Sequence, residues 1–104
     1  MRVIWSSRAE RELTLLVEYG MAVFGRTAAM RLYRQIKVTV TKLTVHPYLG
    51  KKETIIVKGE EIVYRGLVVH KHFKILYNVL GDTIHIVALF DTRRNPASLA
   101  DYFR

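Results

Sequence analysis

The chain has 104 residues, a formal net charge of +8 at pH 7 and no cysteine. This length suits a single domain over residues 1–104, and because half of the residues are apolar we expect a packed core. The lack of cysteine excludes disulfide frameworks, thiolate zinc sites and thiol catalysis. No stretch approaches the roughly 18 consecutive apolar residues of a membrane span. We therefore expect a cytoplasmic protein that does not associate with membranes.

The positive charge favours anionic partners. Seventeen Lys and Arg residues stand against nine Asp and Glu residues, and the isoelectric point is near 10.1. A field of this size attracts nucleic acid, a ribonucleoprotein surface or an acidic protein segment. The sign of the charge does not distinguish among them.

The N-terminal part predicts a short strand and a helix. Residues 2–5, RVIW, are β-prone, and Ser7 with Glu10 three positions later fits a capping box that starts a helix. Gly25 is well placed to end it. Between them one apolar stripe repeats at helical period; its members are Ala9, Leu13, Leu16, Val17, Gly20, Met21 and Phe24.

A second helix is predicted directly after the first. Thr27 is its expected N-cap, and His46-Pro47 prevents its continuation. The short break between the two stripes favours an antiparallel helical hairpin. The apolar positions of the second stripe are Ala29, Leu32, Tyr33, Ile36, Val40 and Leu43.

The remaining chain predicts strands. After a loop from Tyr48 that contains a short strand at residues 54–57, three β-prone runs cover residues 61–69, 72–80 and 83–90. Their tight spacing requires an antiparallel meander, and Asn95-Pro96 would begin a short C-terminal helix. The expected fold class is α+β, with a short N-terminal strand, an antiparallel helical hairpin, a three-stranded antiparallel meander and that helix.

Cations follow the predicted strands. If the register brings Arg65 beside Lys74, and Arg93 emerges at the neighbouring strand end, three positive charges converge on one patch of the sheet. The simpler interpretation is that each is a solvated surface side chain. For Arg93 and Arg94, a local ion pair with Asp91 is the corresponding alternative.

Other kinds of site lack support. The sequence contains no HExxH motif, no Gly-rich phosphate loop and no GxSxG motif. His70 and His72 stand at i and i+2, but no third ligand is in sight. We expect no metal and no cofactor.

Three features of the chain point to a known family: the order of elements, the motifs VIW and AEREL at the start, and the closing segment YRGLVVHKHFKILYNVLGDTIHIVALFDTRRNP. In these features the chain resembles the RelE/ParE superfamily of bacterial toxins from type II toxin–antitoxin modules. The resemblance covers essentially the whole chain. It is most specific in the last forty or so residues.

The RelE-like branch of the superfamily implies a ribosome-dependent mRNA endoribonuclease, in which the 2′-hydroxyl attacks the adjacent phosphate. That reaction needs an acid, a base and cations around the phosphorane. Leu67 stands where such enzymes carry a second lysine, and Leu99 lies near the position of a C-terminal catalytic tyrosine. The catalytic set implied by this branch is Arg65, Lys74, Arg93 and His72.

The ParE-like branch implies a toxin that poisons DNA gyrase, and the long helical hairpin and the RRNP ending favour this branch. Either branch implies a cognate antitoxin, whose acidic or amphipathic segment covers the basic sheet face. A non-toxic RNA-binding domain is the alternative outside the superfamily. The residues expected to bind a partner or nucleic acid are Arg65, His70, Lys71, Arg93 and Arg94.

Overall fold

The computed structural model describes residues 1–70 and 73–92. The predictions made for Lys71, His72, Arg93 and Arg94, and the helix predicted after Asn95-Pro96, lie outside these residues. The described elements are β1 (Arg2–Trp5), α1 (Ser7–Phe24), α2 (Arg26–Val45), β2 (Lys51–Val57), β3 (Glu60–His70), β4 (Phe73–Leu80) and β5 (Thr83–Asp91).

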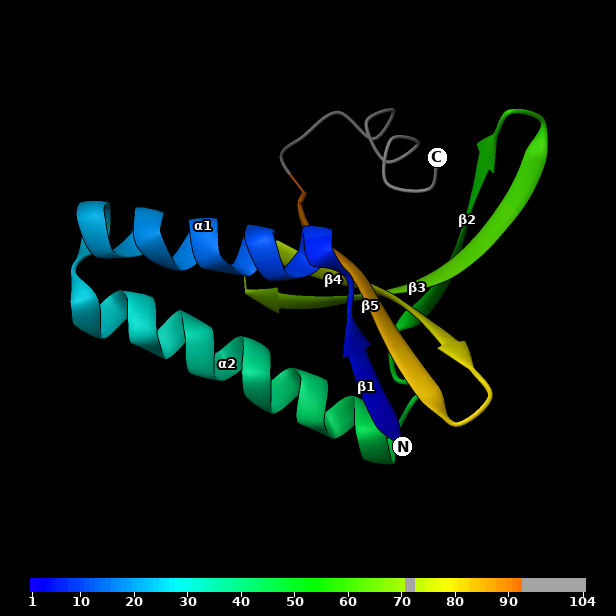
Figure 1. Ribbon diagram of the computed structural model, residues 1–104, viewed down its shortest axis with the longest axis horizontal. Coiled ribbons are helices and arrows are strands. Elements are labelled where there is room, and N and C mark those ends of the chain that lie inside the picture. The colour runs from blue at the N-terminus through cyan, green and yellow to red at the C-terminus, as the bar shows by residue number, and fades with distance from the viewer. Residues whose placement is uncertain (71–72, 93–104) are drawn as a thin grey trace.

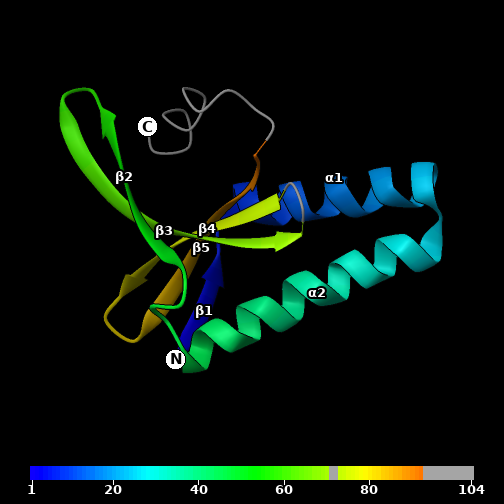
Figure 2. The same cartoon turned by 180° about the vertical axis from the view of Figure 1, so that it is seen from behind.

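The α+β fold is confirmed, with two helices packed against one sheet. The strand order is β1-β5-β4-β3-β2. β1 pairs with β5 in parallel, and the other neighbours are antiparallel. Figure 1 shows α1 and α2 side by side as a hairpin whose closed end projects beyond the sheet, and Figure 2 shows the β2–β3 hairpin reaching out on the opposite side. Neither described helix is long and apolar enough to cross a membrane.

The meander has four strands rather than three. β2 begins at Lys51, three residues earlier than predicted, and pairs with β3 along its full length. Lys58 and Gly59 form the turn, with φ of 52° and 80°. Two consecutive residues with positive φ suit the right-handed twist of a hairpin. The pairing with β3 overrides the charged, Gly-flanked composition that indicated a loop.

The first helix is capped by Ser6 and not by Ser7. Ser6 has extended backbone angles, and its Oγ accepts a hydrogen bond from the Ala9 amide at 2.9 Å. The same hydroxyl donates to the Val87 carbonyl at 2.7 Å. Ser6 therefore starts the helix and ties it to β5, whereas Ser7 is already helical.

A single glycine separates the two helices. Gly25, at φ 91°, ends α1 as predicted and immediately precedes α2. Thr27 lies inside α2, which has no side-chain cap, so the predicted Thr27 cap is wrong. The left-handed backbone at Gly25 reverses the chain within one residue and leaves no space for a capping turn.

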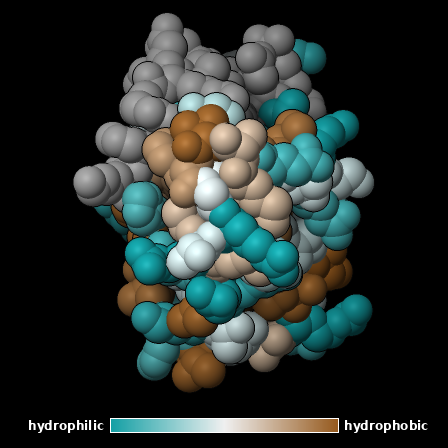
Figure 3. All heavy atoms as spheres, turned by 90° about the vertical axis from the view of Figure 1, so that its left-hand side faces the viewer, coloured by the Kyte–Doolittle hydropathy of each residue, from teal (hydrophilic) through white to brown (hydrophobic). Residues whose placement is uncertain are grey.

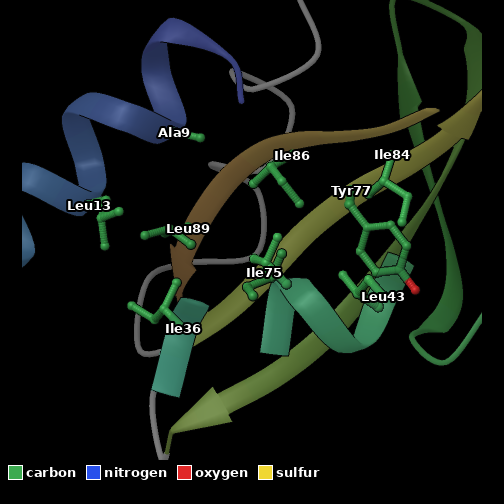
Figure 4. Close-up of a cluster of buried hydrophobic side chains, with 10 residues drawn as sticks. Ala9, Leu13, Ile36, Leu43, Ile75, Tyr77, Ile84, Ile86 and Leu89 are labelled. Atoms are coloured by element: carbon green, nitrogen blue, oxygen red, sulfur yellow. The ribbon is translucent and has the colours of Figure 1, made fainter. Parts of the chain in front are cut away.

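The main core lies between the helices and the sheet. Ala9 and Leu13 of α1 and Ile36, Val40 and Leu43 of α2 face the sheet. They pack on strand residues that are almost fully buried (Figure 4); these are Ile75, Tyr77, Ile84, Ile86 and Leu89. Burial of these apolar side chains is the main source of stability.

Tyr77 connects this core to the loop after α2. Its hydroxyl accepts a hydrogen bond from the Gly50 amide at 2.8 Å and donates one to the Pro47 carbonyl at 2.9 Å. A Cβ atom on Gly50 would lie 2.7 Å from the Tyr77 ring, so only glycine fits there. Burial raises the pKa of Tyr77 above its ordinary value.

The opposite face of the sheet carries a second, smaller apolar cluster. Tyr64, Leu76, Ala88 and Phe90 are buried there. The structure therefore buries both faces of the sheet around the middle of β4.

Candidate functional site

The strand register separates the two described cations of the predicted patch. Arg65 lies opposite Tyr77, and Lys74 lies opposite Val68. Opposed residues share a face of the sheet. Since Tyr77 belongs to the core beneath the helices, Arg65 is on the helix side. Val68 is three residues from Arg65 and points to the other face. The predicted convergence of Arg65 and Lys74 is wrong.

Arg65 is engaged with the loop after α2. Its Nη1 donates to the Gly50 carbonyl at 2.9 Å and, more weakly, to the Tyr48 carbonyl at 3.4 Å. Its guanidinium carbon is 4.9 Å from the centroid of the Tyr48 ring. These contacts hold the loop against β3 and occupy Nη1 of the guanidinium.

Lys74 is engaged on the opposite face. Its Nζ contacts Glu53 Oε1 at 2.8 Å, and the two side chains are only 24% and 21% exposed. They meet over Gly66, where an added Cβ would lie 2.6 Å from Glu53 Oε2 and 2.8 Å from Lys74 Cδ. The charge of Lys74 is therefore neutralised by a fixed partner from β2.

Tyr64 lies beside this ion pair, directly opposite Glu53 in the β2–β3 register. Its side chain is buried. Burial first, and then the charge of Glu53 and a hydrogen bond to it, raise the pKa of Tyr64 to about 12. Each cause disfavours a phenolate at this position.

We expect Tyr64 to make the fold sensitive to alkali. The folded state holds the phenol proton more tightly than the unfolded chain, so this contribution is complete below pH 10 and is lost as the pH rises toward about 12. Chemical unfolding across this range should show a steep fall in the free energy of unfolding for the wild type. The fall should be shallower for Tyr64→Phe, which retains Tyr77. Equal slopes for the two proteins would contradict this assignment.

His70 ends β3 at an exposed position opposite Phe73, after an irregularity in the β3–β4 pairing. Within residues 1–70 and 73–92, no three His, Asp or Glu side chains gather in a way that could hold a metal ion.

The closed end of the helical hairpin is an exposed apolar surface. Tyr19 and Phe24 are 60% and 69% exposed, and their rings meet edge to face with centroids 6.3 Å apart. Figure 3 faces this end and shows a group of apolar residues in its upper centre, with hydrophilic residues across its middle and around it. We call the surface the hairpin tip; it comprises Tyr19, Met21, Val23 and Phe24.

The helical period predicts that Met21 and Phe24 belong to the buried stripe of the first helix. The structure leaves both exposed, because this end of the hairpin extends beyond the sheet that would cover it (Figure 1). Near the tip, Gly20 packs against Ala29 of the second helix, where an added Cβ would lie 3.3 Å from the alanine Cβ. The close approach of the two helices fixes the shape of the tip.

Comparisons with known proteins agree with this architecture. A family model described as "ParE toxin of type II toxin-antitoxin system, parDE" matches residues 3–96. A solved structure titled "Chromosomal ParDE TA system from P. aeruginosa" is similar, with a TM-score of 0.69 and 21% sequence identity over 88% of this chain and 95% of that chain. The search of curated proteins gave no match.

Proposed function

The chain belongs to the ParE toxin family of type II toxin–antitoxin systems, and we propose that it inhibits growth by binding DNA gyrase rather than by cutting mRNA. The observation that carries this choice is the separation of Arg65 and Lys74 on opposite faces of the sheet. The RelE-like ribosome-dependent endoribonuclease is the alternative.

Cleavage of RNA by a 2′-hydroxyl requires acid, base and cationic groups within hydrogen-bond reach of one phosphate. Arg65 and Lys74 cannot both reach one phosphate on a single face. Each is also engaged, Arg65 with backbone carbonyls and Lys74 with Glu53. This geometry supports a toxin that acts by binding.

The hairpin tip is the surface that we assign to the target. Exposed apolar patches rimmed by polar residues mark interaction sites, and buried aromatic side chains dominate the energetics of interfaces. Tyr19 and Phe24 supply two exposed rings, which a partner would bury, at an end of the molecule that projects beyond the sheet.

We also infer a cognate antitoxin, as the ParDE title of the similar structure indicates for that system. The net charge of +8 favours an acidic segment in this partner. Of the residues predicted for this contact, His70 is exposed, whereas Arg65 is already bound to the Gly50 carbonyl.

Gyrase supercoiling in the presence of the purified protein tests the proposal. The wild type should inhibit supercoiling, and the double substitution Tyr19→Ser with Phe24→Ser should weaken inhibition at least tenfold, because interface anchors contribute about 2 kcal/mol or more. The matched control is Ile56→Ser with Val63→Ser, which removes two exposed apolar side chains from the β2–β3 hairpin. It should inhibit like the wild type.

Three outcomes would overturn the proposal. The first is that the wild type leaves supercoiling normal but cleaves mRNA in a translating extract, and that Lys74→Ala or Arg93→Ala abolishes this cleavage. This result would establish the RelE-like alternative. Another is equal loss of inhibition in both double variants, which would remove the hairpin tip from the mechanism. Harmless expression of the wild type, without either activity, would favour the non-toxic RNA-binding domain.

A further inference from the structure

Positive charge is concentrated on α2, whereas its neighbour α1 has a net negative charge. Over residues 26–45 the helix has five Lys and Arg residues and no Asp or Glu, which is +5 of the total +8. In α1 two arginines stand against three glutamates, which is −1. The cations of α2 are Arg26, Arg31, Arg34, Lys37 and Lys42.

Three of these cations, Arg31, Arg34 and Lys42, lie on the side of α2 that faces away from the sheet. Helical period places residues 31, 34, 38, 41 and 45 in one row, with Lys42 beside it, opposite the buried stripe of Ala29, Ile36, Val40 and Leu43. Arg31, Arg34 and Lys42 are all exposed. Both ribbon views place α2 at the outer edge of the molecule (Figures 1 and 2), so this side is open to a large partner.

No described carboxylate neutralises this row. None of the five cations forms an ion pair within residues 1–70 and 73–92. Lys37 lies to the side of this row, with its Nζ 5.0 Å from the Trp5 centroid and 5.6 Å from the Tyr33 centroid. A row of unpaired cations on a rigid helix concentrates positive potential along a line.

We propose that the outer face of α2 binds the phosphodiester backbone of duplex DNA. From Arg31 to Lys42 the helix rises about 16 Å, which lets separate side chains reach successive phosphates along a duplex. Arginine, lysine, threonine and glutamine are the side chains that contact DNA phosphates, and this face also presents Thr41 and Gln35.

The same face fits a protein helix less well. An acidic amphipathic helix docks on a continuous apolar seam flanked by charge. Here Val38 and Val45 are the apolar members of the row, but Arg31 and Arg34 occupy its first half. The seam is interrupted where the charge is densest, which favours a polyanion. The proposal goes beyond gyrase inhibition and does not depend on it.

Fluorescence anisotropy with a labelled random-sequence duplex, over a series of salt concentrations and without gyrase, tests the proposal. The variant combines Arg31→Gln, Arg34→Gln and Lys42→Gln. Its matched control combines Lys51→Gln, Lys52→Gln and Lys58→Gln on the β2–β3 hairpin. Each lowers the net charge from +8 to +5 by removing three exposed cations, so the overall charge is the same in the two proteins.

We expect the α2 variant to bind at least tenfold more weakly at low salt. The slope of log binding constant against log salt concentration should become shallower by about 2 to 3, because each lost phosphate contact reduces the magnitude of this slope by about 0.9. The control should keep the slope of the wild type. Circular dichroism should show both variants folded, because all six positions are exposed.

Equal weakening in the two variants would overturn the proposal, since it would reflect net charge alone. Absence of duplex binding by the wild type would also overturn it, whatever the result of the supercoiling assay. In parallel arms, preferential binding of single-stranded RNA, or of an acidic helical peptide, to the same three residues would reassign the surface to that partner.

Discussion

Replacement of Tyr77 by alanine should lower the free energy of unfolding by about 3–5 kcal/mol, the range observed for truncation of buried aromatic residues. Tyr77 is the largest of the fully buried side chains in the described chain. It packs beside Leu43 of α2 and Ile84 of β5 (Figure 4). Denaturant unfolding of the purified variant measures the loss, which is a large share of the 5–15 kcal/mol typical of a domain.

The substitution Tyr77→Phe separates the hydroxyl from the ring. It should cost about 1–3 kcal/mol, because the Gly50 amide and the Pro47 carbonyl each lose a hydrogen-bond partner. Tyr19→Phe is the matched control, since it removes a hydroxyl from a side chain that is 60% exposed, and it should change stability by less than about 0.5 kcal/mol. Equal effects of the two substitutions would contradict the structural role of the Tyr77 hydroxyl.

Replacement of Ile36 by alanine should lower the free energy of unfolding by about 2–5 kcal/mol. Ile36 is fully buried and points toward Leu89 and Ile75 (Figure 4), so its truncation leaves a cavity between α2 and the sheet. Thermal and denaturant unfolding measure the effect.

The matched control for Ile36 is Val38→Ala on the same helix. Val38 is 54% exposed, so its truncation should change stability by no more than about 0.5 kcal/mol. A similar loss for Ile36→Ala and Val38→Ala would show that α2 does not pack on the sheet through the face described.

The helices were predictable because their information is local. The apolar positions of α1 and α2 repeat at 3.6 residues, and a helix with such a stripe must bury it. Gly25 and His46-Pro47 end the helices for reasons that lie in the backbone of those residues. The caps were less predictable: two adjacent serines precede α1, and only the contact of Ser6 with Val87 selects one of them.

The strands were predictable in part. The spacing of the last three runs was enough to require an antiparallel meander. β2 was underestimated, because its charged residues and flanking glycines are typical of a loop and its pairing with β3 is a tertiary interaction. The exposure of Phe24 was also out of reach, since the 3.6-residue period does not tell where the sheet beneath a helix ends.

The sequence by itself determined the α+β class, the helical hairpin, the excess of positive charge and the resemblance to the toxin superfamily, because each depends on local pattern or composition. Only the tertiary structure decided which charges act together. Strand register sent Arg65 and Lys74 to opposite faces and matched Lys74 with Glu53. Helix packing turned the cations of α2 outward. A shift of one residue in register reverses the face of every side chain in a strand, and no local pattern in this chain fixed that choice.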